Sequence, residues 1–309
     1  MITGALHHLP GIGPKRREQL LQLGVSTWDD FGARPPCGYG AGTASWSRIL
    51  DEIERCRQAL AEERIDVLVR ALAAQDRWRI LSRFFSDATY FDIETTGLEM
   101  DCEITVVVCL HRGAVRRFVL GENLNDFLDL LDDVRLLVSF NGSTFDVPFV
   151  ERYFHIPKIP CPHLDLRWLC HRAGLTGGLK QIEWDLGMSR PSELEGVDGA
   201  EAVRLWWRWR QARDRAARER LVRYCSADVV TLRAIAAHVV RREGGRADDE
   251  ALTPDWTLLS GSETDARVGE KAQSNPVESD WCKAEHARLR RHLARATAKR
   301  GRRPEIGDR

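Results

Sequence analysis

An apolar, β-favouring run at residues 88–93 leads two carboxylates, Asp92 and Glu94, into what should be the core of the fold. Alternate side chains of a strand point to the same face, so the two acids project together while Ile93 points into the core. Two carboxylates aimed at one point repel each other unless a cation lies between them, and burying them without partners is costly. The run therefore predicts a strand that carries a functional site.

Two further acidic motifs follow along the chain. Asp146 closes the segment 141–146, which begins with an Asn-Gly turn signal, and it starts a predicted helix with proline at the third position. Tyr224 and Asp228 are four residues apart within one long predicted helix, 218–240, so they lie on the same face. The spacing would place a phenol hydroxyl beside an acid that binds metal, where it could orient a water.

This set of acids suits the hydrolysis of a phosphodiester. The in-line reaction requires an activated water on one side and a stabilised leaving oxygen on the other, and two metal ions about 3.5–4 Å apart provide both. Hard oxygen ligands without a Cys/His cluster favour Mg²⁺ or Mn²⁺ over zinc. We therefore expect two such ions, held by Asp92, Glu94, Asp146 and Asp228.

Each motif is ordinary when taken alone. The Asp-x-Glu spacing occurs again at Asp101/Glu103 and at Asp248/Glu250, and an Asn-Gly pair followed by Phe-Asp is usually only a turn. A tyrosine four residues before an aspartate is usually a surface pair. The order of the three motifs, and the apolar setting of the first, favour a functional site.

In this order the motifs resemble those of the DEDD exonuclease family, which has a ribonuclease-H-like fold and includes the proofreading domains of DNA polymerases. The tyrosine of the third motif resembles the tyrosine subclass rather than the histidine one. The flanking segments are closer still to the YprB-like ribonuclease-H-like proteins, and the similarity covers roughly residues 78–240. The segments that carry it are His163-Leu164-Asp165-Leu166, Gly178-Leu179-Lys180-Gln181-Ile182-Glu183 leading to Leu186-Gly187, and Leu205-Trp206-Trp207.

The resemblance implies a two-metal 3′→5′ exonuclease that acts on single-stranded DNA or RNA ends. It implies that Asp92, Glu94 and Asp228 bind the catalytic metal, and that Asp92 bridges to the second ion. Asp146 would hold the second ion, directly or through water, and Tyr224 would orient the attacking water. The 3′→5′ polarity is implied by the resemblance alone.

One departure from the family pattern is Cys225, where relatives often have asparagine. It leaves all five catalytic positions unchanged. Two alternatives also stay open: a structure-specific endonuclease of the same fold, and a nucleic-acid-binding recruiting module with little catalysis.

The pattern of the whole chain predicts an α/β fold, a ribonuclease-H-like mixed sheet flanked by helices and preceded by a small all-α helix-hairpin-helix module. The predicted parts are the module (1–33), a helical connector (34–85), the exonuclease domain (86–240) and a polar, disordered linker with a basic C-terminal segment (241–309). The predicted strands are 88–93, 104–110, 114–120 and 136–140, and the predicted helices are 147–154, 164–172, 179–186, 199–211 and 218–240.

The segment Leu9-Pro10-Gly11-Ile12-Gly13-Pro14-Lys15 resembles a helix-hairpin-helix. Its glycines allow a tight hairpin that brings backbone N–H groups close to a phosphate at the start of a helix, and the lysine can reach the same phosphate. We therefore expect Gly11, Gly13 and Lys15 to bind the nucleic-acid backbone. The alternative is a packing or protein–protein element, because many DNA binders use two copies and only one is seen.

Composition limits the remaining choices. The 46 basic and 46 acidic side chains balance, so nucleic-acid binding must depend on local surfaces. The eight cysteines form no Cys-x-x-Cys pair, which suits reduced thiols and a cytoplasmic protein. We expect no signal peptide and no membrane contact, since no apolar run approaches about 20 residues. The basic segment 288–303 fits a phosphate anchor and a solvated tail equally well.

Overall fold

The computed structural model describes residues 1–37, 43–99 and 101–260. Five strands run through this part of the chain: β1 Ala88–Thr95, β2 Ile104–His111, β3 Ala114–Val119, β4 Leu136–Ser139 and β5 His163–Asp165. The α-helices are α1 Pro14–Gln22, α2 Thr43–Ala61, α3 Ile65–Ala71, α4 Arg77–Arg83, α5 Asp126–Leu131, α6 Asp146–Tyr153, α7 Leu166–Arg172, α8 Leu179–Asp185, α9 Gly199–Ala212 and α10 Arg215–Arg242.

The strands form one mixed sheet in the order β3-β2-β1-β4-β5. β1 is central, antiparallel to β2 and parallel to β4, while β3 and β5 are the outer strands. In the register of β1 and β2, Asp92 lies opposite Val108 and Glu94 opposite Val106, and the pairing shifts directly after Glu94. Such irregularities end regular pairing and re-aim side chains, and they are common next to active sites.

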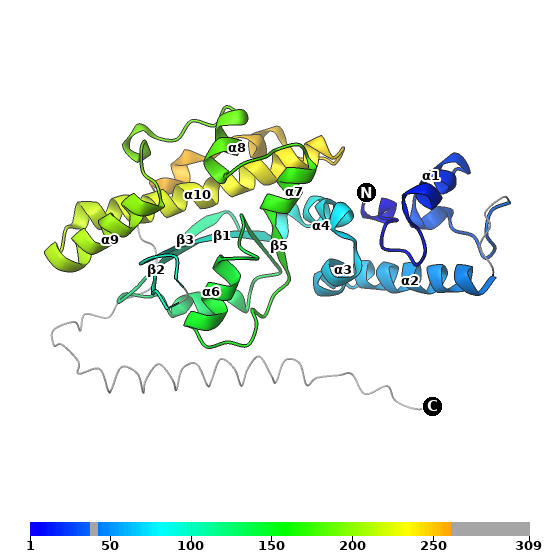
Figure 1. Cartoon of the computed structure of the whole chain (residues 1–309), viewed down its shortest axis with the longest axis horizontal. Helices are drawn as coiled ribbons and strands as arrows, with labels where there is room; N and C mark the ends of the chain where they lie inside the picture. The colour runs from blue at the N-terminus through cyan, green and yellow to red at the C-terminus, as the bar shows by residue number, and fades with distance from the viewer. Residues whose placement is uncertain (38–42, 100, 261–309) are drawn as a thin grey trace.

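Helices cover both faces of the sheet (Figure 1), so the α/β fold class expected from the sequence is confirmed. Alternation along the strands divides the apolar side chains into two cores. Tyr90, Val108 and Val138 belong to the core shared with α10, whereas Phe91 and Val107 belong to the core under α5 and α6. Because Asp92 and Glu94 alternate with Phe91 and Ile93, they point to the face that α10 covers.

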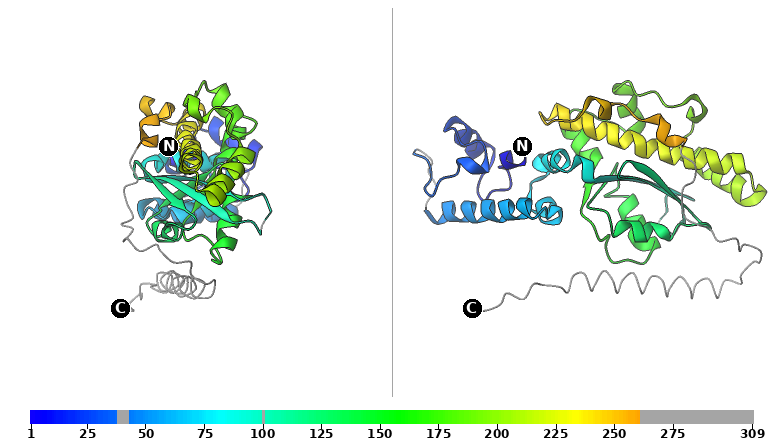
Figure 2. Two further views of the ribbon diagram at one scale, coloured as in Figure 1. Left: turned by 90° about the vertical axis from the view of Figure 1, so that its left-hand side faces the viewer. Right: turned by 180° about the vertical axis from the view of Figure 1, so that it is seen from behind.

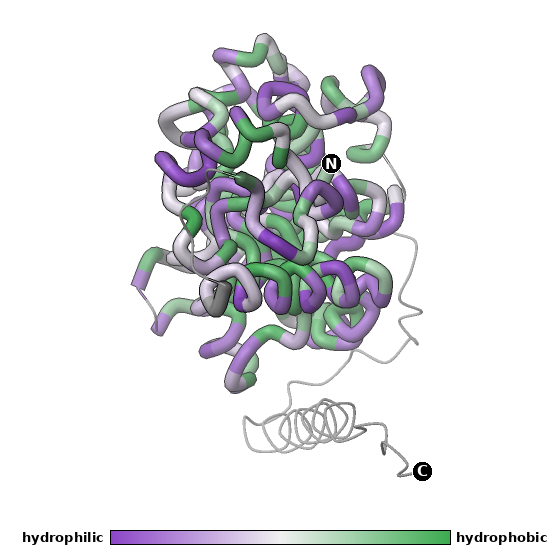
Figure 3. The backbone as a smooth tube through the Cα atoms, turned by 90° about the vertical axis from the view of Figure 1, so that its right-hand side faces the viewer, coloured by the Kyte–Doolittle hydropathy of each residue, from purple (hydrophilic) through white to green (hydrophobic). Residues whose placement is uncertain are grey.

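The predicted strands all appear, with ends shifted by at most a few residues, and two short elements were missed. β5 occupies the start of what the sequence suggested as one helix, 164–172, and α5 lies in a segment with no predicted structure. Both elements are too short to show the periodicity of apolar residues that marks a helix or a strand. Figure 3 shows apolar and hydrophilic stretches alternating along the elements, as expected where each element has one buried face.

The amino-terminal part packs around Trp28, whose indole is fully buried and donates a hydrogen bond from Nε1 to the Ala5 carbonyl at 2.7 Å. A 3₁₀ turn, η1 (Ile2–Gly4), precedes the predicted hairpin, and α1 follows it. A second 3₁₀ turn, η2 (Trp28–Asp30), begins with a capping box between Thr27 and Asp30. Figures 1 and 2 both place α1 and α2 at the opposite end of the molecule from α9.

The connector 34–85 contains three helices, α2, α3 and α4, in its described part. Asp76, which precedes α4, ties this region to the amino-terminal segment, because its carboxylate accepts from the backbone N–H of His7 at 3.2 Å and contacts His7 Nδ1 at 2.8 Å. Arg79 donates to the same carboxylate at 3.1 Å. These contacts join the first residues of the chain to the helix that leads into β1.

The segment after α10 differs from the expectation of a disordered linker starting at residue 241. Residues 243–260 fold back along α10 and form two further 3₁₀ turns, η6 (Asp249–Leu252) and η7 (Trp256–Leu259), which bury Ala251 and Leu259. Arg117 of β3 donates to the Leu258 carbonyl at 2.9 Å. A few apolar side chains anchor this segment, although its average composition is polar. The remainder of the predicted linker and the basic segment 288–303 lie outside the described residues.

No helix in the described part of the chain is long and apolar enough to cross a membrane.

Candidate active site

The first acidic pair lies on β1, at the centre of the sheet. Asp92 is partly buried, and Glu94 is only 9% exposed. Their side chains share the face that α10 covers, while the intervening Ile93 packs into the opposite core. The strand thus places both carboxylates between the sheet and the longest helix.

α10 brings the third motif against this pair. Tyr224 and Asp228 are both buried, and Cys225 is completely so. The Cys225 thiol lies 3.5 Å from Asp92 Oδ2, so this stretch of the helix directly faces β1. One ligand atom each from Asp92, Glu94 and Cys225 lies within 4.8 Å of the others.

Asp146 is the first residue of α6 and comes from a tight turn after β4. Asn141 has a left-handed backbone with φ of 65°, and the Val147 N–H donates to the Gly142 carbonyl at 2.9 Å. A Cβ on Gly142 would lie 1.9 Å from Ser139 Oγ and 3.3 Å from Asp146 Oδ2. Only glycine lets the Asp146 carboxylate approach the backbone so closely here.

A second aspartate, Asp165 at the end of β5, holds this turn in place. Its carboxylate accepts from the backbone N–H groups of Asn141 at 2.8 Å and Ser143 at 3.0 Å. The same carboxylate caps α7 by accepting from the N–H of Arg167 at 3.0 Å. Asp165 is buried, and through these bonds it orients the turn that ends in Asp146.

The electrostatics of the cluster link the three motifs. Burial raises the pKa of Asp92 and Glu94 well above their ordinary values, and the negative charges of Asp228 and Asp146 raise the pKa further. Burial raises the pKa of Asp146 to about 7, and backbone hydrogen bonds, one of them from Ile93, offset part of this rise. The structure therefore brings Asp92, Glu94, Asp146 and Asp228 into one electrostatic cluster.

The tyrosine lies beside this cluster as a neutral phenol. Burial raises the pKa of Tyr224 far above its ordinary value, and the charge of Asp228 raises it further. Burial raises the pKa of Asp228 as well, and the charge of Arg190 together with hydrogen bonds from Arg190 and Tyr224 offsets part of this rise. At neutral pH the phenol can therefore act as a hydrogen-bond donor at this site.

The partly buried Asp92 and the three buried carboxylates of Glu94, Asp146 and Asp228 fit a divalent cation. They resist ionisation together because they repel one another in a buried setting, and a cation bound among them would remove that repulsion. The donor set is mostly hard oxygen, which suits Mg²⁺ or Mn²⁺. The thiol of Cys225 adds one soft donor, and burial together with nearby Asp92 raises the pKa of that thiol well above normal.

Arg190 and Glu183 also belong to this site, although the sequence pattern assigned them no role. Arg190 contacts Asp228 Oδ1 through Nη2, and the same guanidinium binds Glu183 in a fork, with Nε to Oε2 at 2.8 Å and Nη2 to Oε1 at 2.5 Å. Arg190 follows α8 in a segment without regular periodicity, so no spacing could have indicated it. The sequence Gly178-Leu179-Lys180 was noted only as part of the resemblance.

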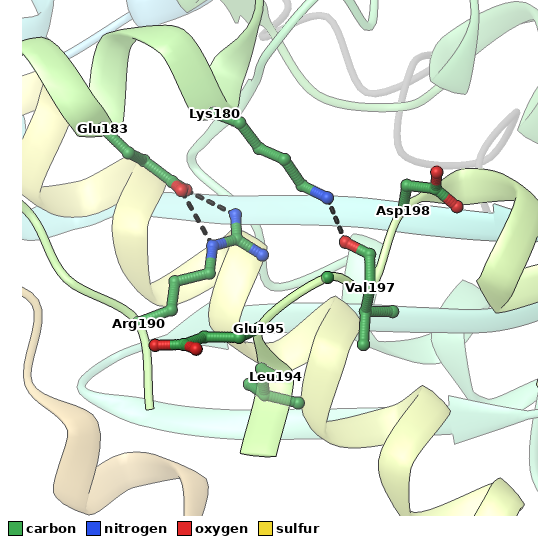
Figure 4. A pocket seen from close by; sticks show the side chains of 8 residues that line it. Lys180, Glu183, Arg190, Leu194, Glu195, Val197 and Asp198 are labelled. Atoms are coloured by element: carbon green, nitrogen blue, oxygen red, sulfur yellow. Dashed lines mark hydrogen bonds and ion pairs between the residues drawn. The ribbon is translucent and has the colours of Figure 1, made fainter. Parts of the chain in front are cut away.

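A pocket of about 410 Å³ lies next to this ion-pair network, between α8 and the segment before α9 (Figure 4). Lys180, Glu183 and Arg190 line one part of it. The rest is lined by Leu194, Glu195, Gly196, Val197 and Asp198. Lys180 Nζ contacts the Val197 carbonyl and lies 5.1 Å from the centre of the Tyr224 ring. The pocket therefore adjoins the third acidic motif.

The predicted phosphate-binding residues of the amino-terminal module lie at the start of α1, which Figure 1 places away from the sheet. Gly11 has a left-handed φ of 73°, and Gly13 is the residue immediately before α1, with Pro14 at its first position. Gly11, Gly13 and Lys15 are exposed at the start of the helix, and the Arg16 guanidinium caps the Gly11 carbonyl at 3.0 Å. This geometry leaves the helix start accessible.

A second group of potential metal ligands combines His8 with Glu52 and Cys56 of α2, whose ligand atoms lie within 4.8 Å of one another. His8 Nε2 lies 3.5 Å from the Cys56 thiol. However, Arg55 already binds both oxygens of Glu52, at 3.0 and 2.5 Å. The carboxylate of this group thus already has a partner, and we assign no site to the three side chains.

Residues 89–240 match the family model described as RNase_H superfamily. The match includes all five residues expected to be catalytic, and this segment has the ribonuclease-H-like fold predicted from the sequence. Among solved structures, the chain is similar to the family B DNA polymerase from the hyperthermophilic archaeon Pyrobaculum calidifontis, with 14% identity and a TM-score of 0.38. That similarity covers 51% of this chain and 27% of the polymerase chain. No curated protein matches the sequence.

Proposed function

We propose that this protein is a metal-dependent nuclease that removes nucleotides from the 3′ ends of single-stranded DNA or RNA. The observation that carries the proposal is the convergence of four carboxylates, three buried and that of Asp92 partly buried, from β1, α6 and α10 beside a neutral tyrosine. A chain does not stabilise its fold by gathering like charges in a buried place, so such a cluster is best explained by a bound cation. The match to the RNase_H superfamily supports the nuclease class.

Asp92, Glu94 and Asp228 would hold one Mg²⁺ or Mn²⁺, and Asp146 would hold a second, with Asp92 shared between the two. When bound, such ions activate a water and stabilise the leaving oxygen of an in-line displacement. The role of these side chains is to fix the positions of the metal ions. Their own attachment to a strand and to two helices makes the arrangement rigid.

Tyr224 would orient the attacking water. Its hydroxyl stays protonated at neutral pH and lies beside Asp228. It can therefore hold a water by hydrogen bonding without taking a proton from that water. The 3′→5′ direction and the preference for single strands rest on the resemblance to the DEDD exonucleases of the tyrosine subclass.

The amino-terminal module would add affinity without base specificity. The exposed start of α1, with Gly11, Gly13 and Lys15, offers backbone N–H groups and a cation to a phosphate. Contacts of this kind bind the backbone only and carry no sequence information.

A comparison of linear and circular single strands tests the proposal. In Mn²⁺ or Mg²⁺, the protein should degrade a linear strand and leave a circular strand of the same sequence intact, because an exonuclease needs an end. Asp92→Asn should abolish degradation, while Asp101→Asn, at the other Asp-x-Glu of this region, should not. Cleavage of the circle would instead indicate an endonuclease of the same fold. Binding of both strands without metal-dependent cleavage would indicate a recruiting module.

A further inference from the structure

A buried cation belonging to the protein already lies against the carboxylate cluster. The Arg190 side chain is only 10% exposed and contacts both Asp228 and Glu183. Glu183 holds the guanidinium through two of its nitrogens, which fixes the plane of the fork. Asp228 therefore has a positive partner before any metal binds.

Arg190 also has donor capacity that the protein does not use. Its Nη1 is buried and has no hydrogen-bond partner among the described residues. A buried guanidinium N–H without a partner costs free energy, so a site that retains one is suited to an acceptor from outside the chain. Arg190 lines the pocket of about 410 Å³ shown in Figure 4, which gives such an acceptor a place.

The surroundings of the pocket indicate which acceptor would fit. The Arg190 guanidinium carbon lies 5.5 Å from the centre of the Tyr224 ring, and Lys180 Nζ lies 5.1 Å from the same ring centre. Both cationic side chains line the pocket. An anion with several oxygens, placed beside the residue that would orient the water, matches a phosphodiester. Arginine is well suited to it because its planar fork binds two phosphate oxygens at once.

We propose that Arg190 binds a substrate phosphate in this pocket, and that Asp228 pairs with Arg190 as long as no metal is bound. This inference rests on the proposed function. In the protein without metal, the guanidinium neutralises Asp228. When divalent ions are bound to the carboxylates, they neutralise Asp228 in place of Arg190. Arg190, still held by Glu183, then binds the oxygens of the substrate phosphate together with Lys180.

The charge of the pocket makes this binding depend on metal. Its two cations, Lys180 and Arg190, share the lining with Glu183, Glu195 and Asp198, and Arg190 is also tied to Asp228. A phosphate would therefore meet net negative charge in the metal-free protein. Divalent ions at the neighbouring carboxylates would offset that charge.

Two opposite effects of one substitution follow. Replacing Arg190 with glutamine removes a positive charge beside the metal ligands and frees Asp228, so the affinity for metal should rise by about threefold to tenfold. The same change removes charge-assisted hydrogen bonds to phosphate, so the affinity for a phosphate ligand should fall by about tenfold or more. A residue that merely stabilised the fold would not move these two affinities in opposite directions.

The experiment uses calorimetric titrations of the full chain, first with Mn²⁺ and then, in saturating Mn²⁺, with dTMP and AMP. These 5′-monophosphates are the products that 3′→5′ hydrolysis would release. We compare the wild type with Arg190→Gln, Arg190→Lys and the control Arg208→Gln on α9, which breaks a surface ion pair with Asp214. Arg190→Lys keeps the charge and loses the fork, so it should bind Mn²⁺ like the wild type and the monophosphates with intermediate affinity. Arg208→Gln should match the wild type in both titrations.

Three results would overturn the inference: weaker Mn²⁺ binding by Arg190→Gln, monophosphate affinity that Arg190→Gln leaves unchanged, and no monophosphate binding by the wild type. If Arg190→Gln fails to melt cooperatively, Arg190→Lys decides, and wild-type monophosphate affinity in that variant overturns the inference. A wild type that binds monophosphates through Arg190 but cleaves no oligonucleotide would contradict the proposed function alone. If the wild type cleaves oligonucleotides but its monophosphate affinity does not depend on Arg190, the result would contradict this inference alone.

Discussion

The Asp165 carboxylate accepts the backbone N–H of Asn141 at 2.8 Å, which joins the end of β5 to the turn after β4. A third residue of that turn, Ser143, donates to the other oxygen of the same carboxylate. Asp146 follows directly, at the start of α6. One buried acid that is not itself a proposed metal ligand thus determines where a proposed ligand lies.

Substituting Asp165 with alanine should therefore impair both stability and catalysis. Three backbone N–H groups lose a charged acceptor, and the loss should destabilise the protein by about 2–4 kcal/mol, because hydrogen bonds to a charged group stabilise more than neutral ones. Urea denaturation measures this loss, and oligonucleotide hydrolysis should fall in parallel as the turn loosens. Asp214→Ala, which removes the helix cap from the first turn of α10, should cost less stability and leave hydrolysis unchanged. Equal effects of the two substitutions would contradict the role of Asp165.

Gly142→Ala tests the close approach of the turn to the Asp146 carboxylate. The added methyl group would lie 1.9 Å from Ser139 Oγ, which is itself held by His163 at 2.8 Å, so the turn must shift. We expect a loss of about 1–3 kcal/mol, typical of overpacking, together with loss of activity. Gly199→Ala, where a Cβ meets nothing within 4 Å, should melt at or above the wild-type temperature. Wild-type activity in Gly142→Ala would show that the position of Asp146 is not critical.

The carboxylate cluster predicts an unusual pH dependence of stability in EDTA. Burial raises the pKa of Asp146 in the folded state to about 7, above its value in the unfolded chain, so the folded protein binds more protons and gains stability as the pH falls through 7. Asp146→Asn removes this titration. The variant should therefore melt several degrees above the wild type at pH 8, and this advantage should shrink towards pH 6.

The comparison with the variant is needed because histidines with a lowered pKa have the opposite effect: they reduce the stability of the folded protein as the pH falls. Burial lowers the pKa of His163 to about 4, for example, which costs stability as the pH falls below about 6.5 in both proteins alike. Saturating Mn²⁺ should reverse the order at pH 8, since only the wild type gains the full binding free energy of the ion. A melting difference that is independent of pH and of metal would argue against a repulsive cluster at Asp146.

Tyr224→Phe separates the orientation of water from the binding of metal. The variant keeps the ring that packs beneath Lys180 and loses only the hydroxyl next to Asp228. Turnover should fall by roughly tenfold to a hundredfold, because the attacking water loses a partner that fixes its position. Mn²⁺ affinity, measured by calorimetry, should stay within about threefold of the wild type. A large loss of metal affinity would contradict the proposed role of Tyr224.

Period-two and helical patterns were enough to predict the elements that carry the cluster. The continuous apolar run at β2 and the acids set into the apolar run at β1 indicated a buried sheet with a site on it, and the i, i+4 spacing placed Tyr224 beside Asp228. These features depend on local geometry, which the sequence expresses directly. The family match and the mixed sheet confirm the predicted fold.

The interactions that the sequence did not reveal are those between side chains far apart in the chain. Arg190 reaches Asp228 across 38 residues, and Asp165 reaches Asn141 across 24. Such pairs depend on how the elements pack, and no periodicity records them. The polar composition of residues 241–260 likewise concealed the two buried side chains, Ala251 and Leu259, that hold this segment against the rest of the protein.

The most direct measurement of the central claim follows a single strand labelled at its 5′ end during incubation with the protein. We expect a ladder of products that shortens from the 3′ end in Mn²⁺ or Mg²⁺, with DNA and RNA strands compared side by side. The ladder should be absent in EDTA and absent for Asp92→Ala or Asp228→Ala, although both variants fold. Wild-type cleavage by either variant, or no cleavage of DNA or RNA by the wild type, would contradict the assignment of the carboxylate cluster as a nuclease active site.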